Sequence, residues 1–496
     1  MAGAHGSGRP NTRRSAYATR DLTTGSIPKN LWFLAWPQVI EGVLRVADQL
    51  ADLIWAGHLG TKSLAGIGVS QQYIQIAFTA RSGIDTSQRA MVSRAIGAGN
   101  TTLANHVVFQ ALTLTVFYSI AMLGIGLFLT EPMLRLLGVS QEVTDIAAPY
   151  MRLQFAGQGF FAFQGLAGQA LAAAGDTLTP MRSTLVTRVT KILLSPLLIF
   201  GVFGLPELGL VGAAIATMVG NCAGMVMNLR NLFLGRSRLH LRPSDYRLDA
   251  RTMWQLLRIG IPASINGMER ALAQILLVGL VAPFGDTALA AFTLTRRVEM
   301  FANLGGQGLG QASGTIVGQS IGAGRPERAK TTVMWAAGYA VAVTGTFSVI
   351  VFIFPHAFLS IFTSDPALLA EATIWLRIQC AGYVVTGLGN ILTQSFMTAG
   401  DTGFPAFVTL ATIWGVQQPV AYVLSRTADL DQYGIAWAVV IALASRLVIY
   451  VPYFFSGRWL RIRVFDGDEA VAAQSPPDAG ERDLSPTPVR IDRTGS

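Results

Sequence analysis

The sequence predicts an all-α membrane protein in which twelve transmembrane helices form two pseudo-symmetric six-helix bundles. Hydrophobic residues make up 51% of the 496 residues and charged residues make up 13%, about half of the charged share of a soluble domain. Twelve membrane-spanning helices of ~20 residues need ~240 mainly apolar positions, which this composition supplies. The composition excludes a soluble enzyme and a disordered chain. With only two cysteines, a disulfide-stapled secreted scaffold is excluded as well.

Twelve long apolar stretches follow one another along the chain. We expect helices at 31–57, 65–95, 102–129, 143–173, 179–203, 209–234, 255–282, 290–321, 327–354, 368–398, 404–425 and 433–457. Apolar runs of this length do not fit a β-barrel, whose strands are ~10-residue alternating segments. The expected domains are a polar tail at 1–30, a first lobe at 31–235, a basic linker at 236–254, a second lobe at 255–460 and a disordered tail at 461–496.

The segments that connect the helices differ in charge. If the N-terminus lies inside, the inner segments hold most of the bases, namely Arg94, Arg182, Arg230, Arg236, Arg238, Arg242, Arg247, Arg251, Arg325, Arg328, Lys330, Arg458, Arg461 and Arg463. Cytoplasmic loops of membrane proteins collect Lys and Arg. We therefore expect an integral protein of the inner or plasma membrane with both termini in the cytoplasm. The same rule accounts for the net charge of +9, so no nucleic-acid partner is expected.

Short motifs recur at one fixed offset of 225 residues. Ile-Gly-Ala-Gly at 96–99 returns at 321–324, Ala-Gly-Asp-Thr at 174–177 returns at 399–402, and Pro37 returns as Pro262. These turns end the second and the fourth helix of each half, where glycine permits a sharp reversal. Six helices per half is an even number, so both halves have the same orientation in the membrane. Such parallel repeats occur in transporters that work by alternating access.

The first helix carries charged residues that a membrane helix normally lacks. Glu41, Arg45, Asp48 and Asp52 fall within ~60° of one helix face. Exposure to lipid would cost ~2.5–3.5 kcal/mol for each, or ~10 kcal/mol in all, so this face must look into protein or water. Glu41 and Arg45 are also spaced as an ordinary structural ion pair. Asp52 has no cation one turn away, which favours a functional role.

Further charges lie in other helices. In the fifth helix Arg188, Lys191 and Ser195 share one face, and in the second helix Asp85 lies between Arg81 and Arg89, an arrangement typical of a structural pair. The seventh helix carries Glu269 and Arg270, and Arg270 is the repeat partner of Arg45. The candidates for residues that line a substrate cavity are Glu41, Arg45, Asp85, Glu269, Arg270 and Asn390. The repeat partners of Asp52 and Lys191 are Leu277 and Val416. An ion or proton site in the first lobe only is the natural interpretation.

Signals of an enzyme are weak. The chain has no HExxH, CxxC or GxxxxGK[ST] motif, and the glycine-rich run at 305–310 lies in an apolar helix, where helix packing explains it. We expect no catalytic residues, no confident metal site and no cofactor. Without a nucleotide-binding loop, the energy source left is an ion gradient, with H⁺ or Na⁺ as the coupling ion.

The motifs together resemble the multidrug and toxic compound extrusion (MATE) family over residues 30–457. They are Ala-Trp-Pro at 35–37, Leu-Ala-Asp at 50–52, Gly-His-Leu-Gly at 57–60, the two paired turns and Leu-Leu-Ile-Phe-Gly at 197–201. The resemblance implies a drug/cation antiporter that exports bulky amphipathic compounds in exchange for H⁺ or Na⁺. It also implies that Asp52 is the family's first-helix aspartate, and it places the family's seventh-helix acid on Glu269.

The sequence departs from the family at the fifth helix. Where the family often has Asn and, four residues later, Asp, this chain has Lys191 and Ser195, and in the tenth helix Asn390 is the polar residue nearest to a carboxylate position. A sodium cage needs oxygen ligands without a competing ammonium. Our hypothesis is that Lys191 pairs with Asp52, with Asp48 beside them, and stands in for the cation. Coupling would then be to protons, with the first helix bending near Pro37.

Several alternatives remain. The main one is a flippase for lipid-linked precursors, for which the basic residues Arg45, Arg81, Lys191 and Arg270 suit an anionic head group. The absence of two additional helices counts against it. A membrane-embedded enzyme would require a cluster of His or Cys, and a channel is disfavoured by the asymmetric repeat. The expected partners are small organic substrates and the lipid bilayer, with a monomer as the expected state.

Overall fold

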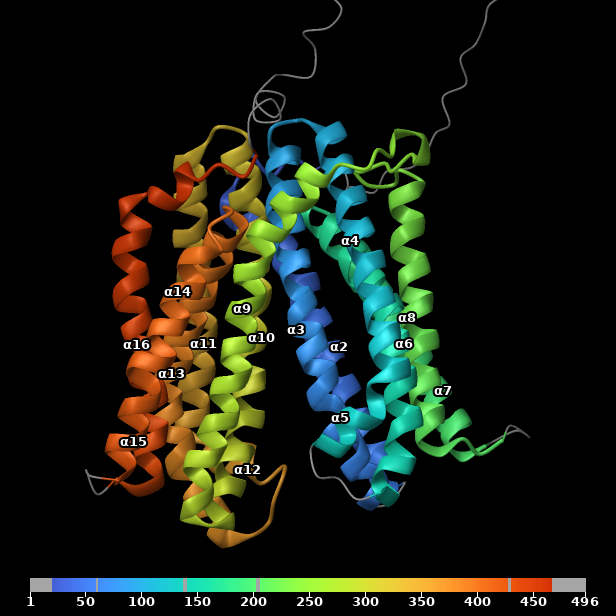
Figure 1. The fold of residues 1–496 in the computed structure, drawn as a ribbon. Coiled ribbons are helices and arrows are strands. Elements are labelled where there is room, and N and C mark those ends of the chain that lie inside the picture. The colour runs from blue at the N-terminus through green and yellow to red at the C-terminus, as the bar shows by residue number, and fades with distance from the viewer. Residues whose placement is uncertain (1–19, 59–60, 137–140, 202–205, 427–429, 466–496) are drawn as a thin grey trace, which may run out of the picture.

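The computed structural model describes residues 20–58, 61–136, 141–201, 206–426 and 430–465, and helices are the only regular elements in these ranges. The first lobe consists of α2 (Ile27–His58), α3 (Thr61–Gly97), α4 (Thr101–Phe128), α6 (Gln141–Ala173), α7 (Leu178–Phe200) and α8 (Gly209–Phe233). The second lobe consists of α9 (Ala250–Val281), α10 (Asp286–Gly322), α11 (Pro326–Ile353), α13 (Pro366–Thr398), the helix from α14 (Gly403–Thr412) to α15 (Gln418–Arg426), and α16 (Asp431–Ser456). The twelve expected helices are confirmed, in two six-helix bundles (Figure 1).

Three features differ from the expected helices. A short helix follows α4 and another follows α11, namely α5 (Thr130–Leu136) and α12 (Pro355–Leu359). Their first residues are 225 positions apart (355 − 130), so they belong to the repeat. The expected helix at 404–425 is interrupted by a π-helical turn at Ile413–Gln417, and its counterpart α7 is a continuous α-helix. Sequence periodicity did not reveal this turn, because one extra residue per turn leaves the apolar run unbroken.

The repeated glycine turns have the backbone conformation that the motifs predict. Gly99 and its repeat partner Gly324 have φ of 77° and 69°, and Gly175 and Gly400 have φ of 101° and 90°. A side chain is strained in this left-handed region, whereas glycine is not. The turns therefore fix where α3, α6, α10 and α13 end.

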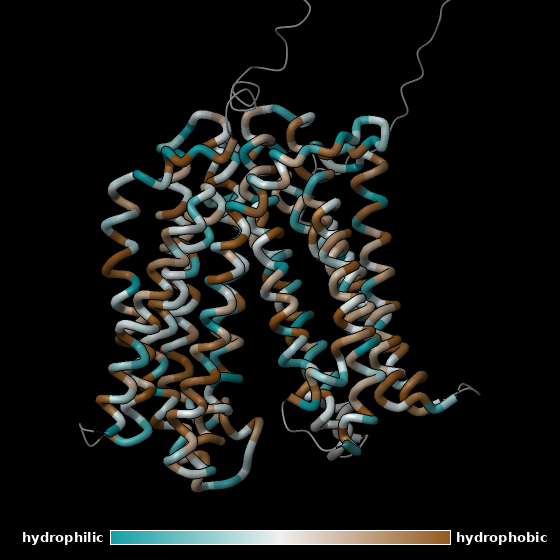
Figure 2. The backbone as a smooth tube through the Cα atoms, in the orientation of Figure 1, coloured by the Kyte–Doolittle hydropathy of each residue, from teal (hydrophilic) through white to brown (hydrophobic). Residues whose placement is uncertain are grey.

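The hydropathy of the helices fits a membrane. Eight of the described helices are long and apolar enough to cross a bilayer, and Figure 2 shows most hydrophilic residues near the two ends of the bundles. The four long helices outside that set are α2, α3, α6 and α10, of which α2, α3 and α10 each carry several charged residues. These four pack against other helices over long stretches of their length.

The two lobes meet close together at one end. There α3 crosses α10 with their backbones almost in contact, because a Cβ on Gly97 would lie 2.0 Å from the carbonyl oxygen of Gln319, and one on Gly322 would lie 2.1 Å from that of Arg94. Gly97 and Gly322 are repeat partners, as are Arg94 and Gln319, so the crossing has the pseudo-twofold symmetry of the repeat. At the other end the lobes diverge (Figure 1).

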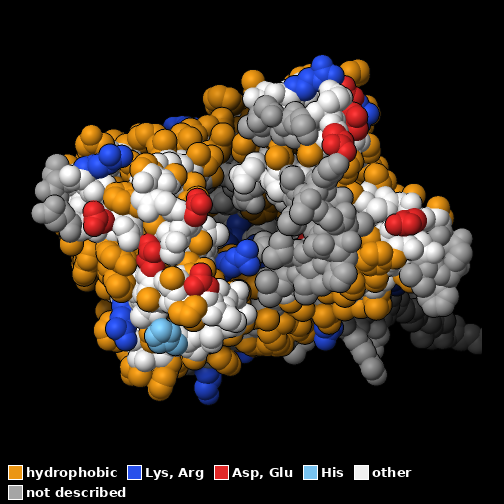
Figure 3. Space-filling view, turned by 90° about the horizontal axis from the view of Figure 1, so that it is seen from below, with side chains coloured by type: hydrophobic (Ala, Val, Ile, Leu, Met, Phe, Trp, Pro, Cys, Tyr) orange, Lys and Arg blue, Asp and Glu red, His pale blue; other side chains and the backbone are white. Residues whose placement is uncertain are grey.

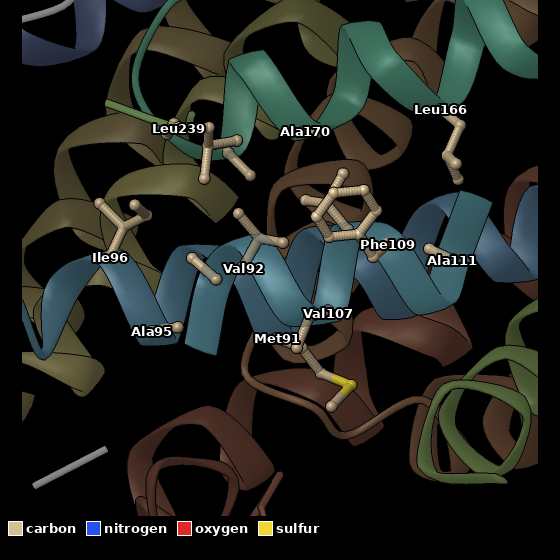
Figure 4. Packing of buried hydrophobic residues seen from close by; sticks show 14 of the residues in the cluster. Met91, Val92, Ala95, Ile96, Val107, Phe109, Ala111, Leu166, Ala170 and Leu239 are labelled. Atoms are coloured by element: carbon tan, nitrogen blue, oxygen red, sulfur yellow. The ribbon is translucent and has the colours of Figure 1, made fainter. Parts of the chain in front are cut away.

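Seen from the end where the lobes diverge, the molecule is hollowed between them, and Lys or Arg side chains lie in the hollow (Figure 3). At the closed end a large apolar cluster joins Met91, Val92 and Ile96 of α3 to Phe109 of α4 and Ala170 of α6 (Figure 4). The closed end is therefore held by packing and the open end is accessible.

Candidate functional site

The charged face of α2 meets α7 inside the first lobe. Arg188 Nη1 donates to Asp48 Oδ2 at 2.5 Å, and Lys191 Nζ lies 3.1 Å from the same oxygen and 2.7 Å from Asp52 Oδ2. Asp48 and Asp52 are four residues apart on α2, and Arg188 and Lys191 are three residues apart on α7, so each pair lies on one face of its helix. The pairing between Lys191 and Asp52 that the sequence predicted is present, and Asp48 completes it.

Burial differs within this cluster, which we call the α2–α7 cluster (Asp48, Asp52, Arg188 and Lys191). Asp48 and Lys191 are 4% and 5% exposed, whereas the side chain of Asp52 is 38% exposed. The formal charges of the four groups sum to zero. Water can therefore reach Asp52, while the cation that holds it is buried.

Lys191 pairs with two carboxylates, those of Asp48 and Asp52, and both contact its ammonium group. The described residues contain no group of three or more His, Cys, Asp or Glu side chains placed to hold a metal ion. A sodium ion between Asp48 and Asp52 would have to displace the ammonium. Protonation of Asp48 or Asp52 would remove one of the two carboxylates that pair with Lys191.

The other first-lobe candidates fall into two separate places. Arg45 Nη2 lies 3.6 Å from Glu41 Oε1, and the Glu41 carboxylate also faces Thr184 and Arg188 of α7. Asp85 lies elsewhere, on α3, where it pairs with Arg81 at 2.7 Å. Because Arg81 is 2% exposed and is fixed within the lobe, this pair has the features of a structural ion pair.

The second lobe has no counterpart of the α2–α7 cluster. Leu277, the partner of Asp52 in the repeat, is buried in the second-lobe core, and Val416, the partner of Lys191, lies in the π-helical turn. Glu269 is half-buried and Arg270 is exposed. Asn390 lies on α13, with its amide near Gly306 of α10. These three residues thus lie in the other lobe, away from Asp52.

Pro37 lies inside α2, which continues through it from Ile27 to His58. Proline has no N–H to donate and disturbs the helix at the preceding turn. The role of Pro37 as a hinge stays a prediction.

Two neighbours of the site were not predicted from the sequence. Tyr150 of α6 is buried close to Asp52, and its hydroxyl accepts a hydrogen bond from Gln154 at 3.0 Å. Thr184 faces Glu41. Both are ordinary polar residues of apolar helices, and no pattern in the sequence marks them as neighbours of residues more than 90 positions away.

Comparison with known proteins agrees with this architecture. The family model described as MatE matches residues 37–197 and 262–423, and the two matches begin 225 residues apart (262 − 37). The chain is 28% identical over 452 residues to the probable multidrug resistance protein YoeA of Bacillus subtilis, covering 89% of this chain and 96% of that one. It is 26% identical over 435 residues to the probable multidrug resistance protein NorM of Thermotoga maritima, covering 87% and 93%.

A solved MOP superfamily transporter from Pyrococcus furiosus has the same fold, with a TM-score of 0.84 and 21% identity over 91% of this chain and 100% of that chain. The family match covers most of both lobes, and the helices are apolar enough for a bilayer. The chain therefore belongs to the MATE family of integral membrane transporters.

Proposed function

We propose that this protein is a secondary active efflux transporter that exports amphipathic organic compounds by alternating access, coupled to the inward movement of H⁺. Two curated relatives that cover nearly the whole chain are named as probable multidrug resistance proteins, which supports the substrate class. The main observation in favour of H⁺ as the coupling ion is the position of Lys191. Its Nζ lies 2.7 Å from Asp52 Oδ2 and 3.1 Å from Asp48 Oδ2.

In this proposal Asp52 is the group that takes up the proton. When Asp52 is ionised, the α2–α7 cluster is neutral and both carboxylates hold Lys191. Protonation of Asp52 removes one carboxylate and leaves an uncompensated positive charge in a region of low dielectric constant, where such charges interact strongly. The contact between α2 and α7 then weakens, and α2 bends near Pro37, where its hydrogen bonding is already interrupted.

One proton can supply enough energy to export a compound that carries no net charge. One elementary charge that crosses a potential of 100 mV releases ~2.3 kcal/mol, which sustains a concentration ratio of about 50 for such a compound. For a monovalent cation such as ethidium the exchange moves no net charge, so the pH gradient supplies the energy. Sodium is the less favoured coupling ion, because it needs several oxygen ligands and Lys191 occupies the space between the two carboxylates.

Transport by purified protein in lipid vesicles tests this proposal. Vesicles loaded with ethidium receive a pH gradient and a Na⁺ gradient in separate experiments. We expect the pH gradient to drive ethidium movement, and we expect Asp52→Asn and Lys191→Ala each to reduce that rate at least about tenfold, a change of ~1.4 kcal/mol. Asp145→Asn, at an exposed carboxylate of α6, is the matched control and should keep the rate.

Either of two results would overturn proton coupling. One is a Na⁺-dependent rate at a constant pH gradient. The other is full coupled transport by Lys191→Ala. Movement of a fluorescent lipid-linked precursor, with no ethidium transport, would instead identify a flippase.

We also propose that both termini lie in the cytoplasm and that the protein works as a monomer. Arg94, Arg238, Arg325 and Arg328 all lie at the closed end of the molecule, where they bind backbone carbonyls. Bases gather on the cytoplasmic side, so the hollow faces outward. A cysteine at exposed Ser244 in the linker should resist membrane-impermeant maleimide in intact cells and react after lysis.

A further inference from the structure

Two arginines of the second lobe, Arg270 of α9 and Arg446 of α16, lie on helix faces that contact α14. On α9, Asn266, Arg270 and Ala273 share a helix face, and the amide of Asn266 donates to Thr409 Oγ1 of α14 at 2.8 Å. This face therefore looks at α14 and not at lipid. From α16, Nε and Nη2 of Arg446 lie 3.4 Å from Thr412 Oγ1, at the end of the same helix. The helix α9 runs parallel to α14 and α15, since Thr402 donates to the Ile259 carbonyl and Gln418 to the Ala273 carbonyl. Arg270 is one turn beyond Asn266, as Thr412 is one turn beyond Thr409, so Arg270 lies level with Thr412.

These two guanidinium groups have no matching carboxylate. Among the residues that the structure describes, neither Arg270 nor Arg446 forms an ion pair, although the charge of Glu269 attracts Arg446. The two contacts of Arg446 with Thr412 are long. Arg270 is exposed. Most of the hydrogen-bond donors of this pair are thus available to another molecule.

The contrast with the first lobe is one of charge. There, Asp48 and Asp52 each have a cation within 3.1 Å and the cluster is neutral. In the second lobe, Glu269, Arg270 and Arg446 sum to +1. An uncompensated charge inside a membrane helix is unfavourable. A bound anion would remove much of that cost, and Figure 3 shows basic side chains in the hollow through which a substrate would enter.

We propose that Arg270 and Arg446, together with the hydroxyl of Thr412, bind an acidic group, a phosphate or a carboxylate, on those carried compounds that have one, whereas a compound such as ethidium does not use this site. Guanidinium groups present planar pairs of donors that fit such groups in a bidentate way. The aromatic or aliphatic remainder of the compound would lie along the apolar wall of the hollow. This inference depends on the proposed function in one respect: it takes the compound that binds at this site to be one that the protein exports.

Equilibrium binding of two flavins, which differ by a single phosphate, tests the inference. Flavin mononucleotide and riboflavin are titrated, by fluorescence anisotropy, against the full-length protein in nanodiscs of phosphatidylcholine, with no ion gradient. We expect flavin mononucleotide to bind at least about tenfold more tightly than riboflavin. Arg270→Gln and Arg446→Gln should each lower the affinity for flavin mononucleotide to near that for riboflavin and leave riboflavin binding unchanged.

The controls separate the site from general effects. Arg377→Gln removes the same charge from α13 at an exposed position, where the guanidinium lies 5.7 Å from the Phe352 ring, and should change neither affinity. Arg270→Lys should keep part of the preference, because the charge remains. Each variant counts as folded if its elution volume in size-exclusion chromatography and its thermal unfolding temperature equal those of the unaltered protein.

Three results would overturn the inference. They are equal affinity for the two flavins in the unaltered protein, no binding of flavin mononucleotide up to about 1 mM, and retention of the preference by both Arg→Gln variants. Loss of the preference in nanodiscs that contain phosphatidylglycerol would show that the pair holds a lipid head group and not a carried compound. None of these outcomes bears on Asp52, since ethidium transport and its proton dependence are measured separately.

Discussion

Asp48 and Asp52 lie one helical turn apart and carry the same charge, yet the structure gives them different roles. Asp48 Oδ2 accepts from both Arg188 and Lys191, and the residue is buried, whereas Asp52 contacts Lys191 alone and is partly exposed. Loss of a buried charge leaves its partners without compensation, which costs more than loss of an exposed one. Asp48 thus organises the α2–α7 cluster, and Asp52 is the group free to change its charge.

At the residue scale we predict that Asp48→Asn lowers the free energy of unfolding by about 3 kcal/mol and that Asp52→Asn lowers it by less than about 1 kcal/mol. Thermal unfolding in detergent, followed by tryptophan fluorescence, measures both. Equal losses in the two variants would contradict the assignment of the structural role to Asp48.

At the scale of elements, the crossing of α3 and α10 depends on two glycines. A Cβ on Gly97 or Gly322 would meet the backbone of the facing helix, which cannot yield as a flexible side chain can. We predict that Gly97→Ala and Gly322→Ala each lower the free energy of unfolding by about 1–3 kcal/mol, the usual range for overpacking. Gly338→Ala on α11, where a Cβ would meet nothing within 4 Å, is the control, and an equal loss there would refute the prediction.

The start of α9 offers a prediction about pH. Asp249 precedes α9, and its side chain accepts hydrogen bonds from the Arg251 amide at 2.9 Å and the Thr252 hydroxyl at 2.5 Å, with His106 Nε2 at 3.3 Å. Partial burial acts to raise the pKa of Asp249, but these hydrogen bonds outweigh it and the net pKa is lowered. A lowered pKa means that the ionised form stabilises the fold above pH ~4 and that this contribution is lost as the pH falls through the lowered value.

We therefore predict that Asp249→Ala lowers the free energy of unfolding by ~1 kcal/mol at neutral pH, as for other helix caps, and that the difference disappears in acid. Thermal unfolding as a function of pH measures it. Asp245→Ala, an exposed acid of the linker, should show no such loss. A difference that persisted undiminished in strong acid would rule out the ionised cap as its cause.

At the scale of the whole molecule, the two ends of the described chain cross between the lobes. Leu22 is buried in the second-lobe cluster, and its carbonyl accepts from Arg328 at 3.1 Å. Val464 and Phe465 are buried in the first-lobe cluster, and Arg94 Nη1 donates to the Ile462 carbonyl at 2.6 Å. Both segments lie at the closed end, so the lobes cannot separate there without moving them.

We predict that Phe465→Ala lowers the free energy of unfolding by about 3 kcal/mol and loosens the closed end. A cysteine at buried Ser93, in a background without Cys222 and Cys380, should then react faster with a thiol reagent. Phe455→Ala, at a side chain that is 68% exposed, should leave the rate unchanged. An unchanged rate in Phe465→Ala would show that this segment does not hold the closed end.

The number and order of the twelve helices follow from the sequence, because long apolar runs and a 225-residue repeat leave little choice of fold. The same holds for the pairing of Lys191 with Asp52, since each is a charge that the membrane would otherwise penalise. The turns at Gly99, Gly175, Gly324 and Gly400 are equally determined, because their conformation depends on the residue type itself.

Only the tertiary structure decided which charges meet. Both the contact of Asp48 with two cations and the contact of Arg446 with Thr412 depend on helices that lie far apart in the chain. Helical periodicity fixes the face on which a side chain lies, but the helix that faces it is set by packing. The physical reason is that local rules fix directions within one helix, whereas the free energy of a buried charge depends on the partner that another helix supplies.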